Sequence, residues 1–140
     1  MKTSSRNILV VDDQEVVRKS YLRSLAETQC NVEAVENGNE ALRAMEQRVF
    51  DVVMLDLRMP GIDGMTTLRT IKQRWPDCEV VVITGYPSVD TAKEALRLGA
   101  HDYLAKPVSP DDVTSAANSA MTHKQWTLRP DHIESCRHAA

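Results

Sequence analysis

The sequence is poor in features that several classes of protein require. Only 4% of its 140 residues are aromatic, too few for a surface on which nucleic-acid bases stack. The formal net charge is −3, without a long run of either sign, which argues against a nucleic-acid groove or a membrane surface. The cysteines, Cys30, Cys78 and Cys136, form no CxxC pair, so we expect reduced thiols.

Two further absences concern targeting and nucleotide binding. The polar N-terminus precedes an apolar stretch that is too short for a signal peptide or a membrane span, so we expect a cytoplasmic protein without a membrane partner. Neither GxxxxGK(S/T) nor GxGxxG occurs in the chain. A phosphate group would therefore have to arrive from a donor other than directly bound ATP.

Short apolar stretches alternate with amphipathic helical stretches. We predict strands at residues 8–11, 31–35, 52–56, 79–84 and 102–105, and helices at 14–28, 41–49, 65–75, 89–96 and 110–121. This alternation is typical of βαβ units, and right-handed crossovers to both faces give an α/β fold with a doubly wound, five-stranded parallel sheet.

The length of the chain suits one domain. We expect a flexible N-terminus at residues 1–5, a folded domain at 6–123, and an irregular or disordered tail at 124–140, where the apolar periodicity ends.

Polar side chains stand where the predicted strands end. Asp12 and Asp13 follow the first strand, Asp56 and Thr84 end the third and fourth, and Lys106 follows the fifth. The carboxyl ends of parallel strands share one edge of the sheet, where ligands bind. Three carboxylates on one edge repel one another unless a cation lies among them.

Each of these residues also has a plain structural interpretation. An Asp at a strand end is often a helix N-cap, and the Thr84 hydroxyl could bond its own backbone. Lys106 could be solvated before the loop proline Pro107, whereas a cis Lys106–Pro107 bond would turn Lys106 inward. Both interpretations stay open for Asp12, Asp13, Thr84 and Lys106.

Taken together, the residues fit phosphoryl transfer. Mg²⁺ prefers oxygen ligands, and Asp13 and Asp56 could each provide one, with Asp12 holding a metal-bound water. Asp56 would be the nucleophile and would form an acyl phosphate. Lys106 and Thr84 would hold the oxygens of the transferred group.

These residues lie in stretches that resemble the receiver domain of bacterial two-component response regulators, the CheY-like family. The resemblance covers residues 6–123. Thr84-Gly85-Tyr86-Pro87-Ser88 is most similar to receivers of nitrogen-regulation-type activators. The stretches that carry the resemblance are Ile8-Leu9-Val10-Val11-Asp12-Asp13, residues 51–64 around Asp56, Val82-Ile83-Thr84-Gly85 and residues 99–107 with Lys106-Pro107.

The resemblance implies a fold and a reaction. It implies the flavodoxin-like strand order 2-1-3-4-5 and Asp56 as the phosphoacceptor from a histidine kinase or phosphotransfer protein. Mg²⁺ would be held by Asp13, Asp56 and the backbone carbonyl of Arg58, with Asp12 acting through water. The domain would be regulatory and not an enzyme, promoting its own phosphorylation and dephosphorylation, with Arg58 and Tyr86 flanking the site.

The resemblance also implies a switch. Thr84 would move toward the phosphoryl group and Tyr103 would swing inward. The fourth helix, fifth strand and fifth helix would then present an altered face to a downstream effector, and a homodimer formed on phosphorylation is a further expectation. Tyr103 could instead be a half-buried packing residue with a solvated hydroxyl.

Two other functions remain open. An aspartate-nucleophile phosphatase of the haloacid dehalogenase type shares Mg²⁺, Asp and Lys, but it uses an acid/base Asp where this chain has Arg58, which cannot be deprotonated. A binding-only domain that takes no phosphate is the third hypothesis. Because only residues 124–140 follow the predicted domain, we expect either a stand-alone receiver or a part of a longer regulator.

Overall fold

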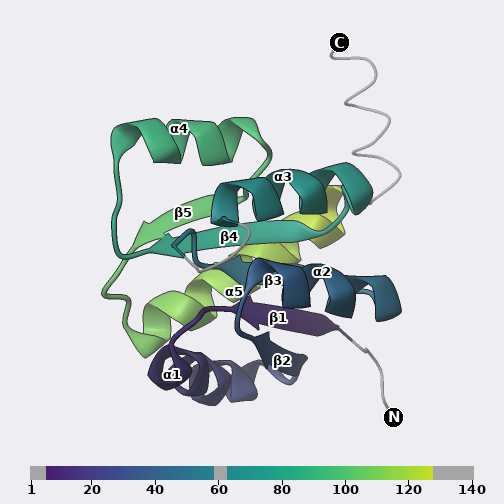
Figure 1. Ribbon diagram of the computed structural model, residues 1–140. Coiled ribbons are helices and arrows are strands. Elements are labelled where there is room, and N and C mark those ends of the chain that lie inside the picture. Colours follow the sequence, from purple (N-terminus) through teal and green to yellow (C-terminus); the bar gives the residue numbers. More distant parts are fainter. Residues whose placement is uncertain (1–5, 59–62, 128–140) are drawn as a thin grey trace.

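The computed structural model describes residues 6–58 and 63–127, and the side chains up to 124 (Figure 1). The flexible N-terminus predicted at 1–5 lies outside the described residues, as do residues 128–140 of the predicted tail. Among the helices of the described ranges, none has the length and apolar character needed to cross a bilayer.

Five parallel strands form one sheet in the order β2-β1-β3-β4-β5. They are β1 (Asn7–Val11), β2 (Asn31–Val35), β3 (Val52–Leu55), β4 (Glu79–Thr84) and β5 (Asp102–Ala105). The predicted doubly wound, flavodoxin-like order is confirmed. All four residues of the central strand β3 are buried, because helices cover both faces of a parallel sheet.

Five α-helices connect or follow the strands within the described residues. They are α1 (Glu15–Leu25), extended by the short 3₁₀ helix η1 (Ala26–Thr28), α2 (Gly38–Gln47), α3 (Gly64–Arg74), α4 (Val89–Arg97) and α5 (Pro110–Thr127). Asn37, Asp63 and Ser88 cap α2, α3 and α4, each accepting a hydrogen bond from the backbone N–H three residues later. Pro110 is the first residue of α5, a position that suits proline because its missing N–H needs no partner there.

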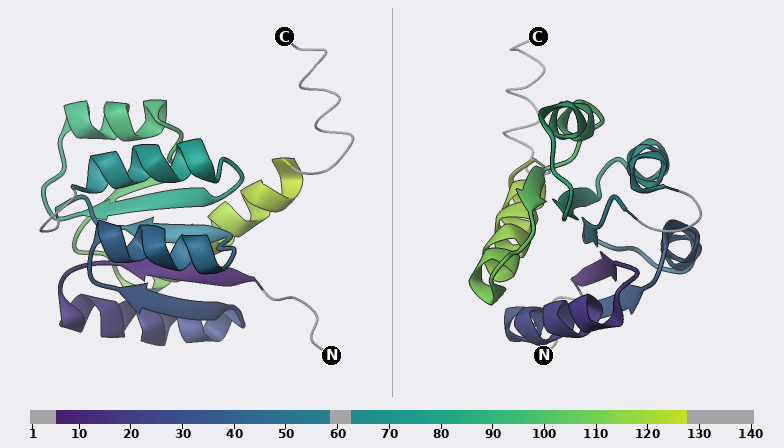
Figure 2. Two further views of the ribbon diagram at one scale, coloured as in Figure 1. Left: turned by 45° about the vertical axis from the view of Figure 1, so that its right-hand side comes forward. Right: turned by 60° about the vertical axis from the view of Figure 1, so that its left-hand side comes forward.

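The helices divide into two layers, with α2, α3 and α4 on one face of the sheet and α1 and α5 on the other (Figure 2). Alternate strand residues supply two cores: Val53, Leu55 and Val80 belong to the α2–α4 side, and Val52 and Met54 to the α1–α5 side. Full burial of one such side chain stabilises the fold by about 1.5–3 kcal/mol. Both faces of the sheet are therefore closely packed against helices.

Two predicted helix ends were wrong. Val49 was expected on the inner side of the second helix, but α2 ends at Gln47 because Arg48 has an extended backbone, and Val49 is 70% exposed. The last helix runs to Thr127, past its predicted end at residue 121. Two polar contacts hold its final turns: Nδ1 of His123 lies at hydrogen-bond distance, 2.8 Å, from Glu79, and Lys124 forms an ion pair with Asp51 at 3.0 Å.

Gly64, the first residue of α3, packs directly against the backbone that follows Asp56. A Cβ at this position would lie 2.4 Å from the Cα of Leu57 and 2.8 Å from the carbonyl oxygen of Asp56. We expect Gly64→Ala to lower the free energy of unfolding by about 1–3 kcal/mol, because neither backbone contact can move away cheaply. Urea denaturation measures the change.

The matched control is Gly85→Ala, whose new Cβ would meet its nearest neighbour, Cδ of Lys106, at 3.8 Å. We expect that variant to change the unfolding free energy by about 0.5 kcal/mol or less. Equal stability of the two variants would contradict the close approach at Gly64.

Candidate functional site

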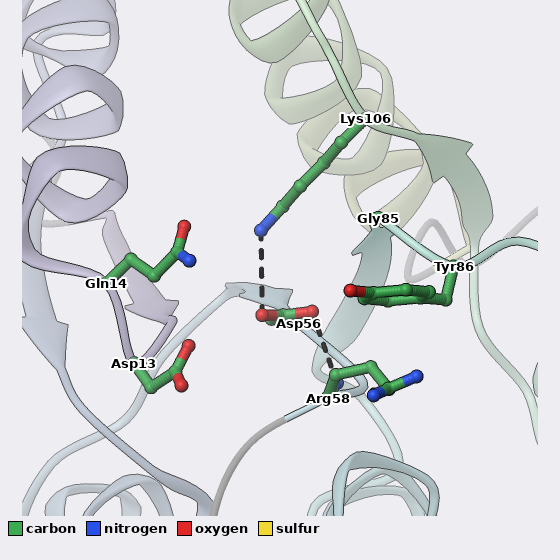
Figure 3. A pocket seen from close by; sticks show the side chains of 7 residues that line it. All are labelled: Asp13, Gln14, Asp56, Arg58, Gly85, Tyr86 and Lys106. Carbon is green, nitrogen blue, oxygen red and sulfur yellow. Dashed lines mark hydrogen bonds and ion pairs between the residues drawn. The ribbon is translucent and has the colours of Figure 1, made fainter.

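The carboxyl-terminal edge of the sheet carries a polar pocket of about 530 Å³. Figure 3 shows Lys106 and Asp56 reaching toward each other across it, with Asp13 and Gln14 on one side and Arg58 and Tyr86 on the other. The residues that line the pocket are Asp13, Gln14, Asp56, Arg58, Gly85, Tyr86 and Lys106. The predicted clustering of side chains from distant strand ends is therefore observed.

Strand pairing brings the acids together. The Asp56 N–H donates to the carbonyl of Val11 at 3.0 Å, and the Asp12 N–H donates to the carbonyl of Val35 at 3.2 Å, so both residues continue the hydrogen-bonding ladders of their strands. Asp12 and Asp56 are buried, whereas Asp13 is exposed. Carboxylate oxygens of Asp12, Asp13 and Asp56 all lie within 4.8 Å of one another.

Lys106 provides the positive charge that these acids contact. Its Nζ lies 2.9 Å from Oδ2 of Asp12 and 3.5 Å from Oδ2 of Asp56, and the Lys106–Pro107 bond is cis. Burial acts to lower the pKa of Lys106, but the hydrogen bond and the charges of Asp12 and Asp56 outweigh it, so the pKa is raised. Lys106 points inward and stays charged.

The carboxylate of Asp56 is only partly compensated. Burial is the main reason that the pKa of Asp56 is raised, and the charges of Asp12 and Asp13 add to it. The Arg58 N–H, which donates to Oδ1 of Asp56 at 3.2 Å, and the Lys106 charge oppose this increase without cancelling it. Asp56 therefore carries a negative charge that the surrounding protein does not fully balance.

The donor set fits a small divalent cation. Three carboxylates and one contacting ammonium leave two negative charges, which one divalent ion balances. The ligands are all hard oxygens, and the exposure of Asp13 leaves room for the waters that Mg²⁺ retains. The resemblance also predicts that the backbone carbonyl of Arg58 is a ligand of the ion, and this stays a prediction.

In this structure the hydroxyls of Thr84 and Tyr103 bond to nearby protein groups. The buried Thr84 hydroxyl accepts a hydrogen bond from the Tyr86 N–H at 3.1 Å and does not line the pocket. The half-buried Tyr103 hydroxyl lies 2.6 Å from the Thr91 hydroxyl and accepts from the Ser88 N–H at 3.2 Å. Tyr103 is thus half-buried, as the packing interpretation expects, and its hydroxyl is bonded to protein groups.

The remaining lining residues come from loops beside the acids. The guanidinium of Arg58 lies 3.9 Å from the centre of the Tyr86 ring, a cation–π contact at the rim of the pocket. Arg58 and Tyr86 flank the site as predicted. Gln14 was missed, although it directly follows Asp12 and Asp13 at the same strand end, which is the signal that could have indicated it.

A protein-family model described as the response regulator receiver domain matches residues 8–118. The chain is 39% identical over 127 residues to the DNA-binding transcriptional regulator NtrC of Salmonella typhimurium, covering 91% of this chain and 27% of that protein. It is 41% identical over 118 residues to the transcriptional regulatory protein ZraR of Escherichia coli O157:H7, covering 84% of this chain and 26% of ZraR.

Solved structures agree with these relatives. NtrX from Brucella abortus, in a complex with ADP, has a TM-score of 0.82 at 30% identity, over 89% of this chain and 29% of that one. A CheY-like receiver domain protein from Methanospirillum hungatei has a TM-score of 0.83 at 26% identity, over 87% of this chain and 98% of that one.

The chain thus spans about a quarter of the length of the two curated relatives. The match covers the sheet, the helices and the acidic edge described above. The chain belongs to the response regulator receiver domain family of two-component systems, as a CheY-like receiver of the NtrC type.

Proposed function

We propose that Asp56 is the phosphoacceptor and that the phosphoryl group comes from the phosphohistidine of a histidine kinase or phosphotransfer protein. The observation that supports this most directly is the setting of the Asp56 carboxylate. It is buried among acids, touches the Lys106 ammonium and the Arg58 N–H, and opens into the pocket.

The reaction needs no general base. A carboxylate oxygen of Asp56 attacks the phosphorus, the P–N bond to the donor histidine breaks, and the electron pair leaves with the imidazole nitrogen. Lys106 stabilises the negative charge on the transferred group. The acyl phosphate is removed by hydrolysis. Water attacks the phosphorus and the P–O bond to Asp56 breaks, which restores the carboxylate and releases inorganic phosphate.

Mg²⁺ is the cofactor that we propose for this site, held by Asp13 and Asp56 directly and by Asp12 through water. When bound, Mg²⁺ supplies positive charge that offsets the oxygens of the phosphoryl group. The chain's own contribution is to hold these acids within 4.8 Å of one another on the buried edge of a rigid sheet.

A phosphatase of the haloacid dehalogenase type is not favoured. The acid/base position of that class is occupied by Arg58, whose guanidinium packs on the Tyr86 ring and cannot exchange a proton at neutral pH. With no general base two residues after Asp56, hydrolysis of the acyl phosphate is expected to be slow. The receiver family match points in the same direction.

An apolar groove beside the pocket is where we propose that the phosphodonor docks. The groove has a volume of about 410 Å³ and includes Val16, Val17, Pro107 and Val108, while Gly85 and Lys106 line both it and the acidic pocket. Val16 is 80% exposed. An apolar contact at this place would bring a donor histidine to Asp56.

Two hydroxyls form the proposed switch. Phosphorylation adds charge beside Thr84, and we propose that the Thr84 hydroxyl then leaves the Tyr86 N–H for a phosphoryl oxygen, while Tyr103 leaves Thr91 and turns inward. The altered face comprises α4, β5 and α5. It is the proposed contact for a downstream effector and for a second activated copy of the chain.

We also propose the cytoplasm as the compartment. Within the described residues Cys30 and Cys78 are free thiols, which fits a reducing environment.

Acetyl phosphate with Mg²⁺ tests the phosphoacceptor. Intact-mass measurement should show one added phosphoryl group on the wild type and none on Asp56→Asn, because an amide is not a nucleophile of this kind. Lys106→Ala should slow formation of the adduct by roughly 100-fold, the usual effect of losing one charge-stabilising donor.

The matched control is Asp77→Asn, an exposed acid outside the acidic pocket, which should behave as the wild type. An equal adduct on Asp56→Asn would place the phosphate elsewhere. A wild type that binds neither phosphate nor beryllofluoride would establish the binding-only hypothesis.

The raised pKa of Asp56 predicts that its charge destabilises the fold. The folded chain holds the Asp56 proton more tightly than the unfolded chain, so stability is lost as the pH rises from the ordinary value of 3.8 through the raised pKa. At neutral pH without divalent ions, Asp56→Asn should be more stable than the wild type by about 1 kcal/mol.

Thermal unfolding in chelator and then in Mg²⁺ measures this difference. The advantage of Asp56→Asn should vanish as the pH falls below 3.8, where the wild-type group is protonated in both states. Mg²⁺ should raise the stability of the wild type and of Asp77→Asn more than that of Asp56→Asn. A less stable Asp56→Asn in chelator would show that the Lys106 and Arg58 contacts outweigh burial.

Two backbone amides report on the switch. The Tyr86 N–H donates to Thr84 and the Ser88 N–H donates to Tyr103, so loss of either bond should move that amide proton upfield in NMR spectra. We expect both shifts when beryllofluoride and Mg²⁺ bind. The Thr66 N–H, which donates to Asp63, should not move. A shifted Arg58 amide beside unchanged Tyr86 and Ser88 amides would contradict the proposed movement.

A further inference from the structure

A second group of ligating side chains lies at the opposite, amino-terminal edge of the sheet. Glu79 is the first residue of β4, His101 directly precedes β5, and His123 lies in the last turns of α5. One ligand atom from each of the three residues lies within 4.8 Å of the other two. The phosphoryl-transfer chemistry proposed above uses none of them.

The contacts within this group are specific. Nδ1 of His123 lies 2.8 Å from Oε2 of Glu79, and the rings of His101 and His123 have centroids 5.0 Å apart. Nε2 of His101 lies 3.0 Å from the hydroxyl of Ser119, one turn before His123 on α5. Because Nε2 has this partner, Nδ1 would be the ligand atom of His101.

Glu79 is an unusual first residue for β4. The five residues after it are buried, and Glu79 itself is only 7% exposed. Val81 and Ile83, which share its side of the strand, pack against α5 in the core. The carboxylate is therefore directed toward the helix that carries His123, and its partner there is an imidazole.

We propose that Glu79, His101 and His123 bind one Zn²⁺ ion. Two imidazoles and one carboxylate are a ligand set that Zn²⁺ prefers, with water in the fourth position. Ser119 is the outer partner that orients His101, as is usual for metal-binding histidines. The nitrogen ligands separate this site from the all-oxygen site at Asp56, which suits Mg²⁺.

Only a small adjustment closes the site around an ion. Donor atoms on a tetrahedral Zn²⁺ with bonds of 2.0–2.1 Å are about 3.3 Å apart. The Glu79–His123 pair is already closer than this, and the half-exposed His123 side chain can move to admit the ion in place of the bridging proton. The bound ion would join β4, the start of β5 and the end of α5.

Cys78, the residue before Glu79, is not part of the proposed site. Its thiol belongs to the core on the α2–α4 face of the sheet, whereas Glu79 is directed toward α5 on the other face.

Calorimetric titration of the full chain with Zn²⁺, in excess Mg²⁺ and a phosphine reductant that carries no thiol, tests the proposal. Mg²⁺ competes for the carboxylates at Asp56 and leaves the histidine site free. We expect one Zn²⁺ per chain, and an affinity at least about tenfold weaker in His101→Gln and His123→Gln. Ser119→Ala should weaken binding by about tenfold or more through loss of the outer partner.

The matched controls are His132→Gln and His138→Gln, which remove histidines of the same chain that are not in the proposed site. Both should bind as the wild type. Zn²⁺ should also raise the unfolding temperature of the wild type but not that of His123→Gln, because only a folded site binds the ion. Circular dichroism verifies that the variants fold.

Three results would overturn the proposal. One is a wild type that binds no Zn²⁺. Another is affinity that is lost in His132→Gln, His138→Gln or Cys136→Ser and kept in His123→Gln. The third is binding that disappears in Asp13→Asn, which would place the ion in the acidic pocket.

Discussion

The contact of one ammonium with two buried carboxylates is the interaction on which the site depends. Lys106 lies 2.9 Å from Asp12 and 3.5 Å from Asp56. It follows β5, which lies three positions from β1 and two positions from β3 in the sheet. Without this charge, three acids within 4.8 Å would repel one another on a buried edge. With it, the edge still holds two uncompensated negative charges, which suits a divalent ion and a reactive carboxylate.

The sheet makes that arrangement rigid. The four residues of β3 are buried on both faces of the sheet. Asp56 is the next residue, so a packed strand holds its backbone in place. The close approach of Gly64 to the backbone of Asp56 and Leu57 fixes the other side of the same loop. The Asp56 carboxylate therefore stands at the end of a packed element. The hydroxyls of Thr84 and Tyr103, in contrast, form hydrogen bonds that could be replaced by bonds to other partners.

The two edges of the sheet offer different ligands. Hard oxygens gather at the carboxyl end, and imidazoles with one carboxylate gather at the amino end. Both groups touch elements of the proposed output face, since Lys106 follows β5 and His123 lies on α5. The proposed Zn²⁺ ion would join α5 directly to the start of β4.

The strand positions, the acids at the strand ends and, through the family resemblance, the strand order could be predicted from the amino acids alone, because apolar runs and the residues that end them are local signals. The length of α5 and the bonding of Tyr103 could not, because they depend on which elements pack together. The final turns of α5 are held by Glu79 and Asp51, and the Tyr103 hydroxyl bonds to Thr91 on α4. Such pairings leave no periodicity in the sequence, because contact energies depend on distance in space and not on separation along the chain.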